Sequence, residues 1–122
     1  MSATLLIVDD SVAIRGVISF VLRGSGYTCV EASDGQAALD VIDTTSIDGV
    51  ISDLWMPGMN GLGLLDSVRK NGMRRFLPFL VLTTDSDPEM HRQLKEAGAT
   101  CVISKPVAPD KLLSAVSRAL GR

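Results

Sequence analysis

The chain has 122 residues, of which 46% are hydrophobic and 4% aromatic, and its formal net charge at pH 7 is −2. This length and composition predict a single domain, residues 1–122, with an aliphatic core, and the charge does not support a basic face that binds nucleic acid. Charged residues or glycine interrupt every apolar run before the ~20 residues that a membrane helix needs, and the N-terminus shows no signal peptide.

Short apolar runs alternate with segments of helical periodicity along the whole chain. Helix boundaries are indicated by capping residues, proline and glycine. We expect strands at 4–9, 27–32, 48–53, 78–83 and 100–104. A helix should follow each strand. The first is capped by Asp10-Ser11 and runs to about Arg23, the second lies between the turn 33–35 and Thr44-Thr45-Ser46, the third covers about 62–71, the fourth runs from Pro88 to Gly98 and the fifth from Pro109 to about Leu120.

This alternation predicts an α/β fold with a doubly wound, five-stranded parallel sheet. Because crossovers between parallel strands are right-handed, two helices should cover one face and three the other. Cys29 and Cys101 fall in the second and fifth strands. If these strands are opposite edges, about four spacings of ~4.8 Å separate the cysteines, far beyond the ~7 Å that a disulfide allows. We therefore expect reduced thiols and a cytoplasmic protein.

Charged or hydroxyl-bearing residues stand where four of these strands end. Asp9-Asp10 close the first strand, Asp53 closes the third, Thr83 closes the fourth and Lys105 follows the fifth. In an open α/β sheet, ligands bind at the carboxyl ends of the strands. These side chains should therefore meet at one end of the sheet, in a site suited to a divalent metal and a phosphoryl group.

A cluster of three carboxylates needs a counter-charge, because two of them ~5 Å apart repel by ~3 kcal/mol at an effective dielectric constant near 20. Either a proton is shared or a cation binds, and oxygen ligands at a wet strand end suit Mg²⁺. Lys105 can pair with a carboxylate or a phosphoryl oxygen, and Thr83 and the backbone N–H of Thr84 can donate to one. Taken singly, each residue also fits an ordinary role: Asp9-Asp10 as a helix cap, Asp53 in a turn and Lys105 in solvent.

The sequence resembles the receiver domains of bacterial two-component response regulators, of the chemotaxis CheY type, over its whole length. That resemblance implies a flavodoxin/CheY-like sheet with strand order 2-1-3-4-5, flanked by five helices. The matching signatures are Val8-Asp9-Asp10-Ser11, Ser52-Asp53-Leu54-Trp55-Met56-Pro57-Gly58-Met59-Asn60-Gly61, Leu82-Thr83-Thr84, Ala97-Gly98-Ala99 and Lys105-Pro106.

Carried over by position, the resemblance implies that Asp53 is the phosphoacceptor. Its carboxylate would attack the phosphoryl group of a phosphohistidine, on a sensor histidine kinase or a phosphotransfer protein, and give an acyl phosphate. The implied Mg²⁺ ligands are Asp10, Asp53 and the backbone carbonyl of Trp55, with Asp9 at or just behind them.

Mg²⁺ and Lys105 are implied to neutralise charge on the transferring phosphoryl group, so that catalysis is mainly positioning and electrostatics. Thr83 would then hydrogen-bond the phosphoryl oxygen, next to the backbone N–H of Thr84. We expect a stand-alone switch and not a true enzyme. Its output protein would bind the surface made by the fourth helix, the fifth strand and the fifth helix, and we expect neither nucleic acid nor a membrane as a partner.

Two positions depart from the family pattern. Val102 stands where an aromatic residue usually swings inward, so a threonine–aromatic switch is in doubt and the signal is expected in the loop after strand four or in helix four. Trp55, two residues after Asp53, either shields the acyl phosphate from water or is simply an exposed aromatic. His91, the only histidine, is expected to be a solvated side chain.

Other functions remain open at this stage. The chain fits a phosphotransfer shuttle, a receiver fragment of a larger regulator, or a receiver that signals without phosphorylation. An aspartyl-nucleophile phosphatase would need an acid two residues after the nucleophile, where this chain has Trp55. A flavodoxin-like FMN carrier is disfavoured because Asp9-Asp10 would repel the phosphate of the cofactor.

Overall fold

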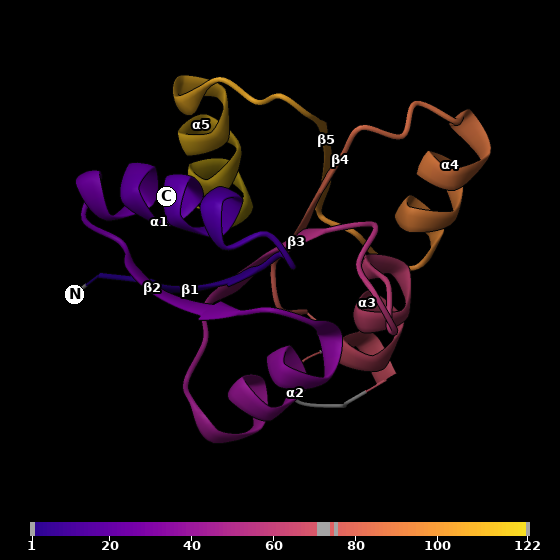
Figure 1. Ribbon diagram of the computed structural model, residues 1–122, viewed down its shortest axis with the longest axis horizontal. Helices are drawn as coiled ribbons and strands as arrows, with labels where there is room; N and C mark the ends of the chain where they lie inside the picture. Colours follow the sequence, from indigo (N-terminus) through magenta and orange to yellow (C-terminus); the bar gives the residue numbers. More distant parts are fainter. Residues whose placement is uncertain (1, 71–73, 75, 122) are drawn as a thin grey trace.

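The computed structural model describes residues 2–70, 74 and 76–121, and in them strands and helices alternate as expected (Figure 1). Most ends agree with the sequence prediction to within a residue, although the expected end of the third helix at Asn71 lies outside the described residues. The elements are β1 (Thr4–Val8), α1 (Val12–Gly24), β2 (Thr28–Ala32), α2 (Gly35–Thr44), β3 (Gly49–Asp53), α3 (Gly61–Lys70), β4 (Phe79–Thr83), α4 (Pro88–Glu96), β5 (Cys101–Ser104) and α5 (Pro109–Ala119).

The strands form one parallel sheet in the order β2-β1-β3-β4-β5, which confirms the predicted topology. Neighbouring strands end nearly level: Val8 of β1 pairs with Ser52 of β3, and Thr83 of β4 pairs with Ser104 of β5. The residues that follow β1, β3, β4 and β5 therefore lie close together at the carboxyl end of the sheet.

Both faces of the sheet are covered, as Figure 1 shows, by α1 and α5 on one side and by α2, α3 and α4 on the other. The side chains of β1 alternate between the two cores: Leu5 and Ile7 pack towards α1 and α5, whereas Leu6 and Val8 pack towards α2 and α3. The two-and-three division of helices is as predicted from right-handed crossovers.

Arg69 of α3 links the segments that precede β4 and β5, at the amino end of the sheet. Its guanidinium donates to the carbonyl oxygens of Gly98 (2.8 Å), Leu77 (2.7 Å) and Arg74 (3.3 Å). Gly98 has a φ of +103°, and a Cβ there would lie 2.9 Å from Nε of Arg69. The glycine thus provides both a left-handed helix end and room for the guanidinium.

The two cysteines lie on β2 and β5, the opposite edges of the sheet, and both are free thiols. Burial is the main factor that raises the pKa of the Cys29 thiol above its ordinary value. In the part of the chain that the structure describes, no helix combines the length and the apolar character needed to cross a membrane.

Candidate functional site

The three predicted acids come together at the carboxyl end of the sheet. Asp9 and Asp10 follow β1, and Asp53 ends the adjacent β3, so the topology alone brings them side by side. One carboxylate oxygen from each residue lies within 4.8 Å of the other two. Asp9 is buried, Asp53 is half-buried and Asp10 is exposed, so the cluster opens to solvent on the Asp10 side.

Lys105 reaches this cluster from β5. Its Nζ lies 3.1 Å from Oδ1 of Asp53 and 3.4 Å from Oδ2 of Asp9. The backbone holds the lysine in place, since its N–H donates to the carbonyl oxygen of Thr83 at 2.9 Å. One ammonium beside three carboxylates leaves two negative charges when all the groups are ionised, which a single divalent cation would balance.

The Asp53 carboxyl has a pKa above its ordinary value. Burial is the largest cause, because it disfavours the charged form, and the charge of Asp9 acts in the same direction. The hydrogen bond and charge of Lys105 oppose the shift without cancelling it. The carboxylate that is expected to react is therefore poorly compensated by the protein alone.

Asp9 is held by contacts that sequence reasoning missed. Its Oδ1 accepts the N–H of Ser11 at 2.9 Å, and its backbone carbonyl accepts Nη1 of Arg15 at 2.5 Å. Arg15 also pairs with Glu31 of β2 at 3.2 Å. Because Lys105 occupies Oδ2, both oxygens of Asp9 already have partners. The sequence signal for this brace was only a basic residue one turn into the helix after Asp10.

The loop after Asp53 is folded tightly back onto β3. The N–H of Gly61 donates to the carbonyl of Leu54 at 2.7 Å, and a Cβ at Gly61 would lie 2.6 Å from the carbonyl oxygen of Asp53. Leu54 and Met56 are buried, whereas Trp55 between them is 48% exposed. This alternation turns the indole outwards and fixes the backbone next to the Asp53 carboxylate.

Thr83 is 1% exposed, and its hydroxyl faces its own loop. Oγ1 accepts the N–H of Asp85 at 2.9 Å, while Thr84 is exposed. The prediction of a solvated His91 is wrong: the imidazole is half-buried, and its Nε2 lies 2.6 Å from the carbonyl oxygen of Asp85. Val102 is also half-buried and packs in the core beside α4.

The family model of the response regulator receiver domain matches residues 5–117. The chain belongs to this family. It is 38% identical to the chemotaxis protein CheY4 of Vibrio cholerae, whose structure it matches with a TM-score of 0.93 over 98% of this chain and 99% of that one. It is also 37% identical, over 95% of its length, to the sensory/regulatory protein RpfC of Xanthomonas campestris, and 33% identical, over 98%, to the phosphate regulon regulatory protein PhoB of Pseudomonas aeruginosa.

Receiver domains are signalling modules that accept phosphoryl groups, and response regulators interact with histidine kinases and with output proteins. The chain spans 16% of RpfC and 52% of PhoB, so those relatives are larger regulators. The receiver domain therefore occurs both in a small protein such as CheY4 and in these larger regulators.

Receiver domains generally bind Mg²⁺ at an acidic pocket, and the residues present here fit that ion. All the side-chain donors in the cluster are carboxylate oxygens, the ligand type that Mg²⁺ prefers, and they are few enough for the ion to keep several waters. The two negative charges left by Lys105 match the charge of the ion.

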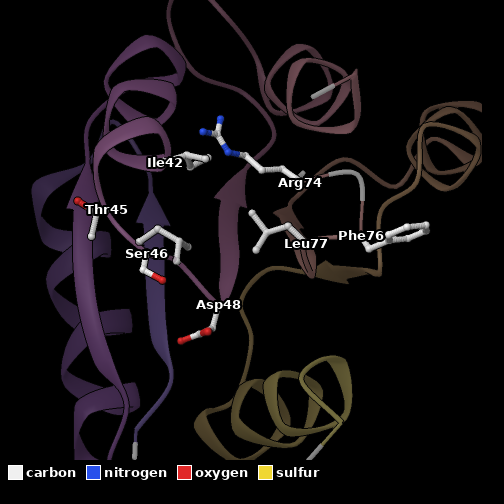
Figure 2. Close-up of a pocket in the computed structure, with 8 residues that line it drawn as sticks. Ile42, Thr45, Ser46, Asp48, Arg74, Phe76 and Leu77 are labelled. Atoms are coloured by element: carbon white, nitrogen blue, oxygen red, sulfur yellow. The ribbon is translucent and has the colours of Figure 1, made fainter. Parts of the chain in front are cut away.

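Hollows lie at both ends of the sheet. One, of about 590 Å³, adjoins the acidic cluster between Asp10, the start of α2 and the loop at Pro57. Another, of about 470 Å³, opens at the opposite end of the sheet, where Arg74, Asp48 and Leu77 surround it (Figure 2). There, Asp48 accepts the N–H of Thr4 at 2.7 Å and Arg74 pairs with Asp43, so these polar groups serve the fold.

Proposed function

We propose that this receiver domain accepts a phosphoryl group on Asp53 in a Mg²⁺-dependent reaction and signals by binding another protein. The observation that carries the proposal is the convergence of Asp9, Asp10, Asp53 and Lys105 from three separate strand ends. An arrangement that gathers like charges is costly unless a cation binds among them, and a bound cation can then also attract the phosphoryl oxygens.

Each residue has a part in this proposal. Asp10, Asp53 and the backbone carbonyl of Trp55 would hold Mg²⁺, and the ion would neutralise charge on the phosphoryl oxygens. Asp9, with its oxygens bound by Ser11 and Lys105, acts just behind these ligands.

An oxygen of Asp53 forms the new bond to phosphorus as the P–N bond of the donor phosphohistidine breaks, and the electron pair remains on the histidine nitrogen. Lys105, already 3.1 Å from Asp53, stabilises the transferring group. Thr83 and the backbone N–H of Thr84 donate to the phosphoryl oxygen afterwards.

We further propose that residues 1–122 act as a stand-alone, cytoplasmic receiver. The phosphoryl donor is a sensor histidine kinase or a phosphotransfer protein, and the output protein binds the α4–β5–α5 surface, in chemotaxis or a related two-component pathway. The near-complete two-way coverage of CheY4 supports this reading. The larger relatives support the alternative of a receiver belonging to a longer regulator, and a phosphotransfer shuttle is the third reading.

The test is incubation with acetyl phosphate and Mg²⁺, followed by intact mass measurement. We expect the mass of one phosphoryl group to be added to the wild type and to Asp66→Asn, which removes an exposed carboxylate on α3, and not to Asp53→Asn. Phosphorylation of the Asp53→Asn variant, or a wild type that gains the group without Mg²⁺, would refute the proposal. A pull-down with the beryllofluoride-loaded protein then identifies the output partner.

A further inference from the structure

The turn that carries Thr83 is tied to α4 by one imidazole. The N–H of Asp85 donates to Oγ1 of Thr83 at 2.9 Å, and the carbonyl of the same Asp85 accepts a hydrogen bond from His91 at 2.6 Å. A carbonyl oxygen only accepts, so Nε2 of His91 carries the proton whether the ring is neutral or charged. The backbone of a single residue thus joins the threonine to the second turn of the helix.

Apart from this contact, α4 is lightly held. Leu94 is its one buried residue, and Met90 is the partly buried residue that packs against the core beside it. The ion pairs of Arg92 with Glu89 and Glu96 lie on the exposed side of the helix, where such pairs contribute little. A helix anchored in this way belongs to the low-stability end of a fold, and a small change in one contact can move it.

We propose that His91 is a positioning residue that holds the Thr83–Asp85 turn in the arrangement of the unphosphorylated domain, and that α4 is released when this bond breaks. The proposal rests on the proposed function, in which Thr83 turns its hydroxyl to a phosphoryl group on Asp53. When the hydroxyl turns, Oγ1 of Thr83 leaves the N–H of Asp85. The backbone of Asp85 then shifts, and its carbonyl moves away from His91. The Asp53 site and the α4 surface are thereby coupled without an aromatic residue at Val102.

The test compares beryllofluoride binding in saturating Mg²⁺ by wild type, His91→Leu and His91→Gln. Leucine keeps bulk and removes the donor, whereas glutamine keeps an N–H at a similar reach. His91→Leu loses a bond that is made only in the unphosphorylated arrangement. The beryllofluoride concentration at half saturation should therefore fall about fivefold, the equivalent of about 1 kcal/mol. The concentration for His91→Gln should stay close to that of the wild type. Gln93→Leu, an exposed change on the same helix, is the control and should also match wild type.

Equal affinity of wild type and His91→Leu would overturn the inference, and so would a His91→Gln variant that behaves like His91→Leu. A measurement without any variant adds a second check: the Nε2 proton of wild-type His91 should be protected from exchange in the free protein and lose that protection with beryllofluoride. Protection that persists unchanged would also overturn the inference. A wild type that binds no beryllofluoride, or an Asp53→Asn variant that still binds it, would instead remove the proposed function.

Discussion

Removing Asp10 should weaken the site and strengthen the metal-free fold. Two carboxylates at the 4.8 Å limit of this cluster repel by ~3.5 kcal/mol at an effective dielectric constant of 20 and by ~1 kcal/mol in bulk water. Asp9, Asp53 and Lys105 together present one net negative charge to Asp10. Because Asp10 is exposed, the lower figure applies, and Asp10→Asn should stabilise the metal-free protein by about 1 kcal/mol.

This free energy corresponds to a measurable shift in melting temperature. At about 2.1 cal/mol/K of unfolding entropy per residue, a 122-residue domain gains about 4 °C for 1 kcal/mol. Magnesium should cancel this difference between the two proteins, since the variant gains ~0.4 kcal/mol at most from the ion. A site with a Kd near ~1 mM gains ~1.4 kcal/mol at ~10 mM Mg²⁺, and the variant, lacking one anionic ligand, should bind the ion at least about tenfold more weakly.

The assay is thermal unfolding of wild type and Asp10→Asn in EDTA and in Mg²⁺. Asp66→Asn is the matched control, because it changes the net charge equally but breaks an exposed 2.9 Å pair with Lys70, so it should lose about 0.3–0.5 kcal/mol. If metal-free Asp10→Asn melts at or below the wild type, the acids do not repel one another in solution. The reasoning about a counter-charge then fails.

Three further outcomes are expected. Trp55→Ala should shorten the half-life of the acyl phosphate on Asp53 if the indole shields it from water; an unchanged half-life in a phosphate-release assay would show that this exposed side chain has no kinetic role. Arg69→Met should lower the free energy of unfolding by about 2–3 kcal/mol in urea titrations, since three carbonyls lose a charged donor, and a loss below 1 kcal/mol would contradict this. In metal-free protein, the raised pKa of Asp53 makes folding more favourable at pH values below the ordinary carboxyl range, and this contribution to the free energy of unfolding is lost as pH rises through the raised pKa. Asp53→Asn should therefore lose less stability than the wild type as pH rises from the ordinary carboxyl pKa to the raised one. Identical pH profiles of the two proteins would refute the direction of the shift.

The sequence predicted the strands and the meeting of the acids because both follow from local pattern. Apolar runs such as Leu5–Val8 signal a buried strand by themselves, and the parallel topology then aligns every carboxyl end. The strand order came from the resemblance to receiver domains. Periodicity alone does not distinguish which strand neighbours which.

Long-range polar contacts were out of reach for a different reason. Arg69 meets Gly98 across 29 positions, and Arg15 meets Glu31 across 16, with no periodic signal at either separation. His91 meets Asp85 at a spacing of six, which a helix preceded by an irregular loop makes possible and which no capping rule anticipates. Such contacts depend on loop geometry, and loop geometry depends on the assembled sheet.

Val102 and His91 both affect the free-energy difference between the inactive and active states of the domain. Moving a two-state equilibrium from mostly inactive to mostly active takes up to ~5.5 kcal/mol of differential stabilisation, and a side chain as small as Val102, half-buried beside α4, offers little of it. In the proposed switch, new charge-assisted bonds from Lys105 and Thr83 to a phosphoryl group would supply about 1.5–3 kcal/mol each, and breaking the bond at His91 would subtract about 1 kcal/mol. On this proposal, that cost favours the inactive state in the resting protein and the bond at His91 raises the threshold for activation. Removing the bond should then produce a receiver that switches at lower phosphoryl occupancy.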